Sequence, residues 1–254
     1  MRSYAHLIGA SIIATVIPHS GDAKNVKCPI VLTQATQLFL AIAPKLSSST
    51  GSGQLYSRQT TSDRWSPVGA KFALSFGRNG LGWSFDQTAY GQAGAPTKRE
   101  GDKRTPAGIF RAGQPFSLRE SNLKNYLRLS EGTVCVDDIR SKKYNQVTRL
   151  SDIKKNMSHE KMWRIELYSS GVIVDTPTNQ KKRGGSCIFL HVWRSPGKPT
   201  AGCVASDEIN IQRIQQLFSS AKSAVALLPK DALKAFEICG LPVEIPRSPE
   251  EKKL

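Results

Sequence analysis

The sequence predicts a mainly β fold, a β-sandwich-like mixed sheet with one or two helices near the C-terminus. Short apolar stretches recur from residue 53 onward between Gly, Pro, Asn and Asp residues, as in GQLYSRQ, GIFRAG and GVIVDTP. Such stretches, separated by turn-forming residues, are typical of strands. Apolar residues at helical spacing are concentrated after residue 206, so the helices are expected there.

The strands are expected in the following order. The apolar segment 28–44, which contains IVLTQATQLFLAIA, predicts one or two strands. Residues 47–53 (SSSTGSG) are small and polar, which predicts a flexible turn. The later stretches WSPVGAKFALSFG and CIFLHVW predict two further strands of the same sheet.

Two helices are expected in the last third of the chain. Ser206 can cap the first, and acidic residues occupy its first turn. The face expected to pack on the sheet consists of Ile211, Ile214, Leu217, Phe218 and Ala221. Pro229 is expected to end this helix. A second helix is predicted over residues 231–239, because Gly240 is a typical C-terminal stop.

The composition indicates a globular and strongly basic protein. The chain has 254 residues, 39% of them hydrophobic, which is enough to bury a core. Its mean hydropathy of −0.33 excludes a multi-span membrane protein. Lys and Arg number 36 against 20 Asp and Glu, a formal charge of +16. This charge indicates an anionic environment, of which bacterial envelope polymers are one class. The basic residues are scattered and no nucleic-acid motif occurs, so no nucleic acid is expected as a partner.

Residues 1–23 have the layout of a secretory signal peptide. The apolar run of residues 7–17 is shorter than the roughly 20 residues that a membrane-spanning helix needs. Gly21 and Ala23 place small residues at the positions that a signal peptidase requires. We therefore expect an exported protein of the periplasm or cell envelope. Residues 24–52 are expected to form an N-terminal strand and linker segment, and residues 247–254 a charged tail.

An odd number of cysteines fits an exported protein that keeps one working thiol. Oxidising compartments allow pairs of cysteines to form disulfides. If one of the five is a working thiol, the other four can pair in three ways, and the sequence does not choose among them. No CxxC motif occurs and the histidines lack ligand spacing, so neither a metal site nor a cofactor is predicted. The cysteines are Cys28, Cys135, Cys187, Cys203 and Cys239.

The candidate catalytic residues are concentrated in residues 187–205, CIFLHVWRSPGKPTAGCVA. Alternation along a strand places Cys187, His191 and Trp193 on one face. The loop after this strand can turn the chain back so that Cys203 faces His191. A thiol and an imidazole brought together in this way can form a reactive thiolate–imidazolium pair.

The residues beside this pair suit acyl transfer. Gly202 permits the close approach of a substrate carbonyl and leaves backbone N–H groups to stabilise an oxyanion. Val192 follows His191, so a side-chain hydroxyl is not present there to orient the imidazole. A backbone carbonyl is expected to orient it instead.

Several segments resemble the L,D-transpeptidase (YkuD-type) family. Members carry a His and then a Ser/Thr-x-Gly-Cys turn that bears the nucleophile, as His191 and residues 200–203 (TAGC) do here. Residues 101–108 (GDKRTPAG) resemble the family's Thr-Pro-x-Gly segment, which ends a loop and starts a strand. Further segments that look like one branch of the family are FGRNGLGW (76–83), VDD (136–138) and YN (144–145). The resemblance implies an L,D-transpeptidase-like catalytic domain over residues 53–246.

The chain also departs from the family pattern. Many members have a second His directly before the Gly-Cys and an Arg two residues after the Cys, whereas this chain has Ala201 and Ala205. The catalytic His is the upstream one, so the chemistry is retained. Other residues must hold the donor peptide, and Arg194, Trp193 and Thr200 are the candidates for substrate binding.

The resemblance implies a peptidoglycan L,D-transpeptidase that forms 3–3 crosslinks between stem peptides. Cys203 is then the nucleophile that forms an acyl-thioester, and His191 is the general base and later the general acid. Two alternatives stay open. A hydrolytic member of the same fold, either an L,D-carboxypeptidase or an amidase that releases wall proteins, would use the same thioester. A basic module that binds envelope polymers or nucleic acid would not use the Cys–His pair at all.

Cleavage after Ala23 is the testable expectation from the N-terminal segment. The apolar run is too short to anchor the chain, so a signal peptidase should remove residues 1–23 during export. N-terminal sequencing of the protein from its native host measures this directly. An intact Met1 on cytoplasmic protein would show that the signal-peptide interpretation is wrong.

Overall fold

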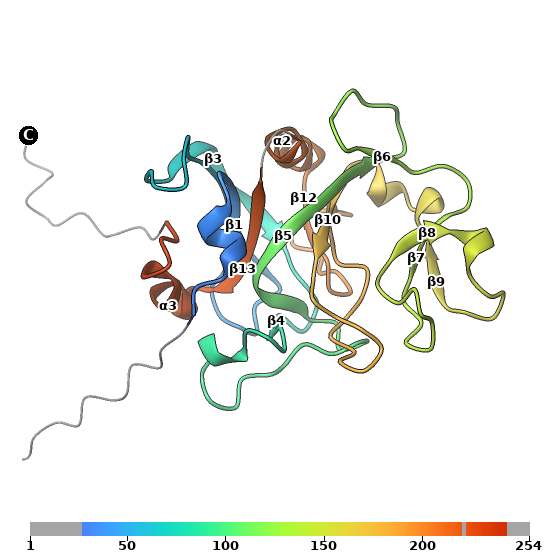
Figure 1. Ribbon diagram of the computed structural model, residues 1–254, viewed down its shortest axis with the longest axis horizontal. Coiled ribbons are helices and arrows are strands. Elements are labelled where there is room, and N and C mark those ends of the chain that lie inside the picture. Colours follow the sequence, from blue (N-terminus) through green and yellow to red (C-terminus); the bar gives the residue numbers. More distant parts are fainter. Residues whose placement is uncertain (1–26, 220–221, 243–254) are drawn as a thin grey trace, which may run out of the picture.

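The computed structural model describes residues 27–219 and 222–242 (Figure 1). The predicted signal peptide of residues 1–23, the tail of residues 247–254 and Ala221 lie outside the described residues.

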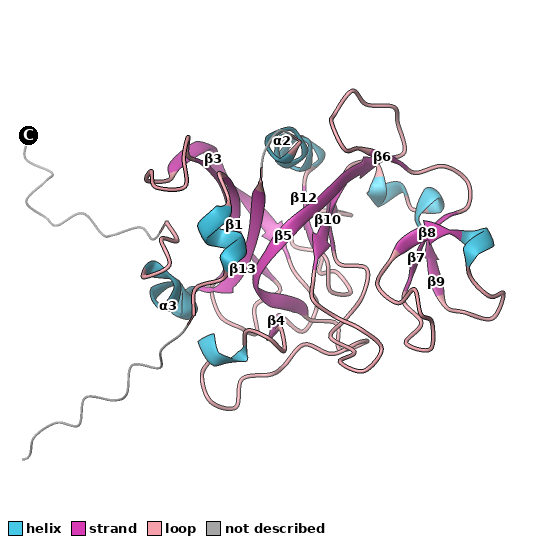
Figure 2. Ribbon diagram, in the orientation of Figure 1, coloured by secondary structure: helices cyan, strands magenta, loops and turns pink. Residues whose placement is uncertain are grey.

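The prediction of a mainly β fold is confirmed, because strands account for most of the regular structure (Figure 2). The strands are β1 (Gln37–Ala43), β2 (Thr50–Ser57), β3 (Ser66–Ser75), β4 (Leu81–Trp83), β5 (Thr105–Ser117), β6 (Leu127–Arg128), β7 (Thr133–Val136), β8 (Val147–Arg149), β9 (His159–Lys161), β10 (Gly171–Asp175), β11 (Phe189–Val192), β12 (Val204–Ser206) and β13 (Ser223–Pro229). The helices are α1 (Ile30–Gln34), α2 (Glu208–Phe218) and α3 (Leu233–Glu237). Short 3-10 turns occur at Thr88–Tyr90, Leu150–Asp152, Met162–Arg164, Glu166–Tyr168 and Lys230–Ala232.

The main sheet is mixed and closes on itself. Its strands follow the order β10, β11, β12, β3, β2, β1, β13 and β5, and β5 pairs in turn with β10. The long β5 makes this closure, because Gly108 to Arg111 pair with β13 whereas Arg111 to Phe116 pair with β10. Figure 1 shows β5 as the long green strand that crosses the molecule. Closure leaves these eight strands without an unpaired edge and surrounds a core that includes Phe39, Phe76 and Phe110.

The N-terminal segment differs from the prediction of strands and a linker. Residues 30–34 form α1 rather than a strand, because the pairing of β1 with both of its neighbours begins only at Gln37. The Arg58 guanidinium donates hydrogen bonds to the carbonyls of Leu32, Thr33 and Ala35, which satisfies the end of this short helix. β1 lies between β2 and β13, so residues 37–43, and residues 50–52 at the start of β2, are part of the closed sheet.

Residues 50–53 lie in β2 and do not form the flexible turn that their composition predicts. A Cβ atom at Gly51 would lie 2.1 Å from the Ile42 carbonyl oxygen, and one at Gly53 would lie 2.7 Å from the Phe39 ring. The small residues therefore reflect close packing between neighbouring parts of the sheet.

The C-terminal helices are present, with two corrections. Asp207 caps α2 by accepting a hydrogen bond from the Asn210 N–H at 2.9 Å, whereas Ser206 is the last residue of β12. Pro229 ends a strand and not the helix, because residues 223–229 are wholly buried in β13 between β1 and β5. A continuous apolar run fits a buried strand as well as a helix, so periodicity alone did not separate the two.

The packing face of α2 agrees with the prediction for Ile211, Ile214 and Phe218, which are buried. α3 lies within the predicted second helix, and Gly240 follows it with a positive φ of 77°, as a C-terminal stop requires.

Residues 118–170 form an insertion between β5 and β10, which are neighbours in the closed sheet. Within the insertion, β8, β7 and β9 make a separate three-stranded sheet, seen at the right of Figure 1. A second hydrophobic cluster joins the insertion to the main sheet. Its buried members are Phe116, Leu129, Cys135, Met162, Tyr168, Cys187 and Phe189.

Two disulfides select one of the three pairings that the sequence left open. Cys28 bonds to Cys239 and Cys135 bonds to Cys187, which leaves Cys203 as the free cysteine. The first bond ties the segment before α1 to the segment after α3, and the second ties β7 of the insertion to the residues before β11. None of the helices in the described ranges has the length and hydropathy that a membrane-spanning helix requires.

Removal of the terminal disulfide should destabilise the fold. Cys28 and Cys239 are separated by 211 residues, so their bond restricts the unfolded chain strongly. We expect the double variant C28S/C239S to lose about 2–5 kcal/mol of free energy of unfolding, measured by denaturant titration without reductant. The single variant C203S, which breaks no disulfide, is the matched control. Equal unfolding midpoints for the double variant and the wild type would contradict this expectation.

Candidate active site

His191 is held at a central position of the closed sheet. It lies on β11, with Gly171 of β10 and Ala205 of β12 as its cross-strand neighbours, and both are small enough to leave room for the imidazole. The His191 side chain is buried, and its Nδ1 lies 2.8 Å from the Val192 carbonyl oxygen. A carbonyl only accepts hydrogen bonds, so Nδ1 carries the proton and Nε2 is left to accept one. The backbone therefore orients the imidazole, as the sequence predicts.

Cys203 immediately precedes β12, and its thiol is held by the backbone before and within β11. Its Sγ donates to the Cys187 carbonyl oxygen at 3.3 Å and accepts from the Phe189 N–H at 3.4 Å. Among the described residues, no hydrogen bond joins this thiol to His191. The two side chains nevertheless line the same cavity, of about 550 Å³. The structure therefore brings together the two residues that the sequence paired.

Two threonines fix the turn that carries the thiol. Thr200 Oγ1 donates to the Cys203 carbonyl oxygen at 2.6 Å and accepts from the Gly202 N–H at 3.1 Å. Thr105, at the start of β5, donates to the same Cys203 carbonyl at 3.2 Å. The Thr200 hydroxyl is thus engaged within the turn, although the residue also lines the cavity.

Gly202 is required in this turn by its backbone conformation. Its φ is +154°, and a Cβ atom there would lie 3.1 Å from the Arg104 carbonyl oxygen. The Gly202 N–H is occupied by Thr200, whereas the Cys203 N–H has no partner within the described part of the chain. The Cys203 N–H is therefore the backbone donor available to an oxyanion beside the thiol.

Charged side chains surround the mouth of the cavity. Trp193 and Arg194, predicted to bind substrate, both line it. Lys198 of the same loop and two cations of other loops line it as well. All four cations of this basic rim are exposed: Arg78, Lys103, Arg194 and Lys198. Arg78 and Lys103 belong to segments that the family resemblance singled out, but their place at the cavity depends on long-range folding.

The insertion supplies the inner wall of the cavity, which the sequence analysis did not predict. Tyr168 is buried, and its ring meets the His191 ring edge-on with centroids 5.4 Å apart. The Tyr168 hydroxyl donates to Glu160 Oε2 at 2.7 Å, and Glu160 also lines the cavity. Neither residue lies in a recognisable motif, and both are separated from His191 by more than twenty residues of sequence.

Burial favours the neutral forms of both the Cys203 thiol and the His191 imidazole. Desolvation raises the pKa of the Cys203 thiol to about 12, with a smaller contribution in the same direction from Glu160. Desolvation likewise lowers the pKa of His191 to about 4, against the opposing effect of the Val192 carbonyl. The resting pair is therefore a thiol and a neutral imidazole, whose Nε2 is free to accept a proton.

The described residues form no candidate metal site. Within residues 27–219 and 222–242, no group of three or more His, Cys, Asp or Glu side chains is close enough to hold a metal ion.

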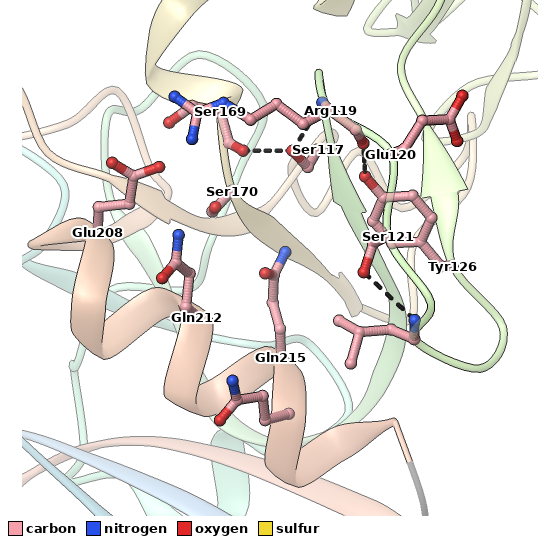
Figure 3. Close-up of a pocket in the computed structure, with 12 residues that line it drawn as sticks. Ser117, Arg119, Glu120, Ser121, Tyr126, Ser169, Ser170, Glu208, Gln212 and Gln215 are labelled. Carbon is pink, nitrogen blue, oxygen red and sulfur yellow. Dashed lines mark hydrogen bonds between the residues drawn. The ribbon is translucent and has the colours of Figure 1, made fainter.

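A second polar hollow lies at the base of the insertion, between α2 and the loop after β5 (Figure 3). Ser117 Oγ donates to the Ser169 carbonyl, and Gln215 donates to the carbonyls of Phe116 and Gly171. These bonds fix the two points where the insertion leaves and rejoins the main sheet, so they hold Tyr168 in place.

Comparison with known proteins finds little similarity. No family model matches the chain, and no curated protein sequence matches it. A solved structure of the helical cell shape determining protein Pgp2 from Campylobacter jejuni is 14% identical, with a TM-score of 0.41 over 77% of this chain and 48% of that chain. The K307A mutant of Pgp2 is 13% identical, with a TM-score of 0.40 over 77% and 47%. The chain therefore spans about half the length of these structures, and a likeness at this level carries no function from them.

The buried imidazole should make the fold acid-sensitive. Between pH 6.5 and about 4 the unfolded chain binds a proton at His191 that the folded chain does not, so the free energy of unfolding falls as the pH drops. The full shift corresponds to about 3 kcal/mol. Denaturant unfolding at a series of pH values should give a flatter stability curve for H191Q than for the wild type over this window. Parallel curves would show that His191 does not titrate in this way.

Proposed function

We propose that this chain is an exported cysteine acyltransferase, a peptidoglycan L,D-transpeptidase that forms 3–3 crosslinks. The observation that carries the proposal is that a free thiol and a singly protonated imidazole open into one cavity. They come from the two segments that resemble the family's histidine strand and its nucleophile turn. The distant structural similarity to Pgp2 adds no weight to it.

The first step is acylation of Cys203. As the resemblance implies, Sγ attacks the carbonyl between the third residue of a tetrapeptide stem and its terminal D-Ala. His191 Nε2 takes the thiol proton during the attack, because Nδ1 is already protonated and bonded to the Val192 carbonyl. The Cys203 N–H stabilises the oxyanion, and His191 then gives the proton to the departing amine of D-Ala. A thioester on Cys203 remains.

The second step transfers the acyl group to an amine. The amino group of a third-position diamino acid on another stem attacks the thioester carbonyl, and the thiolate of Cys203 leaves. The product is a 3–3 crosslink, and the thiol regains its proton. No metal ion or organic cofactor takes part in either step as we propose them.

The surface charge supports an acidic polymer as the partner. The basic rim surrounds the cavity, and stem peptides carry several carboxylates. The formal charge of +16 would draw the protein to anionic envelope polymers as well, an attraction that salt screens. Two disulfides fit an oxidising location such as the periplasm or cell envelope.

Hydrolysis is the second candidate function. Cys203 is partly exposed and the cavity rim is open to solvent, so water can reach a thioester there. The same acylation followed by water attack would convert tetrapeptide stems to tripeptides. The two functions therefore differ only in the molecule that resolves the thioester.

Product analysis tests the proposal. We expect purified protein incubated with disaccharide-tetrapeptides to give crosslinked dimers, detected by mass, through a thioester on Cys203. C203A should form no thioester, and H191A should acylate about 10²–10⁴-fold more slowly because it lacks the general base. Circular dichroism of both variants checks that they are folded.

The outcomes separate the candidates. Tripeptides without dimers would support the hydrolytic candidate. The absence of any product or thioester would contradict an enzyme of this class and would favour a binding module. A carbapenem, which the family resemblance implies as an acylating agent, provides an independent probe, and an adduct on any residue other than Cys203 would show that the nucleophile is wrongly assigned.

A further inference from the structure

Glu160 is a carboxylate in the cavity that the acylation step does not use. It lies on β9 of the insertion. Among the described residues that line the cavity, it is the one acid, facing four cations of the basic rim. An acid placed in the wall of an otherwise basic cavity has a desolvation cost, which a bound cation would offset.

Two series of bonds and contacts connect Glu160 to Cys203 and to His191. In the first series, Glu160 is the cross-strand partner of Cys135, which forms a disulfide with Cys187. The Cys187 carbonyl in turn accepts a hydrogen bond from the Cys203 thiol at 3.3 Å. In the second series, Glu160 accepts a hydrogen bond from the Tyr168 hydroxyl at 2.7 Å, and the Tyr168 ring contacts the His191 ring. Glu160 is therefore held near the reacting atoms by covalent and hydrogen-bonded supports.

The distribution of charge in the cavity matches a zwitterionic ligand. Arg78, Lys103, Arg194 and Lys198 are exposed at the rim, whereas Glu160 is less exposed than these cations and lies on the inner wall with Tyr168. An α-amino acid centre has a carboxylate and an ammonium group on one carbon. Its carboxylate can pair with the cations of the basic rim, and its ammonium group can pair with the Glu160 carboxylate.

We propose that Glu160 binds the ammonium group of the acceptor and takes its proton, so that the free amine can attack the Cys203 thioester. The proposal rests on the acyl transfer described above and names the acceptor as an amine on a carboxylate-bearing carbon. The Tyr168 hydroxyl donates to Oε2 of Glu160, so Oε1 is the oxygen that we assign to the amine.

The protons balance across this step. The acceptor ammonium gives one proton to the Glu160 carboxylate, and the resulting amine attacks the thioester carbon. The second proton of the attacking nitrogen passes to His191 Nε2, the C–S bond breaks, and the Cys203 thiolate takes that proton back as a thiol. Glu160 then releases its proton to solvent.

The surroundings of Glu160 make it a stronger base than an exposed carboxylate. Burial raises the pKa of Glu160, and the nearby acids Asp137 and Glu100 raise it further, against the lowering effect of the Tyr168 hydrogen bond. A carboxyl group with a raised pKa is better matched to accept a proton from an amine.

The test is the partition of one acyl-enzyme between amine and water. A tetrapeptide donor is supplied with increasing glycine, the smallest zwitterionic amino acid, and the ratio of glycine-exchanged stem to hydrolysed tripeptide is measured by mass. Both products come from the same thioester, so their ratio does not depend on the rate of acylation. We expect E160Q to lower this ratio at least ten-fold and E160D to restore part of it.

Glu166 provides the matched control, because it belongs to the same insertion but is exposed and lines no part of the cavity. E166Q should keep the wild-type ratio. The loss in E160Q should appear as a higher glycine concentration for half-maximal exchange, a change that a merely structural role of Glu160 would not produce. Glycolate, which lacks the ammonium group, should compete with glycine more weakly than β-alanine does.

Each outcome decides the question. An E160Q ratio within two-fold of the wild type would overturn the role of Glu160 while leaving the acyl transfer intact. Failure of the wild type to form a thioester on Cys203 would overturn the proposed function and this role with it. If E160Q does not fold, as judged by circular dichroism, E160A takes its place, and a ratio within two-fold of the wild type for folded E160A would reject the proposal.

Discussion

The structure depends on the pairing of one strand, β5, with two partners. Its middle pairs with β13 and its last residues pair with β10, which closes the main sheet and places β11 beside β10. At the start of the same strand, Thr105 donates a hydrogen bond to the Cys203 carbonyl. One continuous strand of 13 residues thereby supports, through β10, the strand that carries His191 and, through Thr105, the turn that carries Cys203. A change that loosened this pairing would separate the two halves of the site without touching either reacting side chain.

The parts of the fold that could be predicted from the sequence are those that local pattern determines. The alternation in CIFLHVW predicted the β11 strand, and the missing hydroxyl after His191 predicted that a backbone carbonyl orients the imidazole, which the structure identifies as that of Val192. Local pattern did not decide between helix and strand for SAVALLP, which became β13 because β1 and β5 were available on both sides. It also did not reveal Glu160 and Tyr168, because their place at the cavity depends on how a whole insertion packs. The disulfide pairing could not be predicted for the same reason, since the number of residues between two cysteines says little about the distance between them in a closed sheet.

The neutral state of Cys203 and His191 would have a chemical benefit for the exported enzyme that we propose. A thiolate is the form of cysteine that oxidants attack, and burial keeps Cys203 in the thiol form. The thiol also bonds to backbone groups on both sides of residue 188 and does not point freely into solvent. In the proposed mechanism, the sulfur becomes reactive only when a substrate carbonyl reaches it and His191 takes the thiol proton during the attack.

The Cys135–Cys187 disulfide joins the insertion to the backbone that holds the nucleophile. In a chain whose cysteines are still reduced, that link is absent, and two additional thiols lie in the same hydrophobic cluster against which Cys203 packs. Oxidation of the first two thiols to each other then does two things at once: it completes the inner wall of the cavity and it leaves Cys203 without a neighbouring thiol to pair with. If Cys203 paired with either of these thiols instead, the proposed nucleophile would be lost, and thiol–disulfide exchange would be needed to restore the pairing seen in the structure.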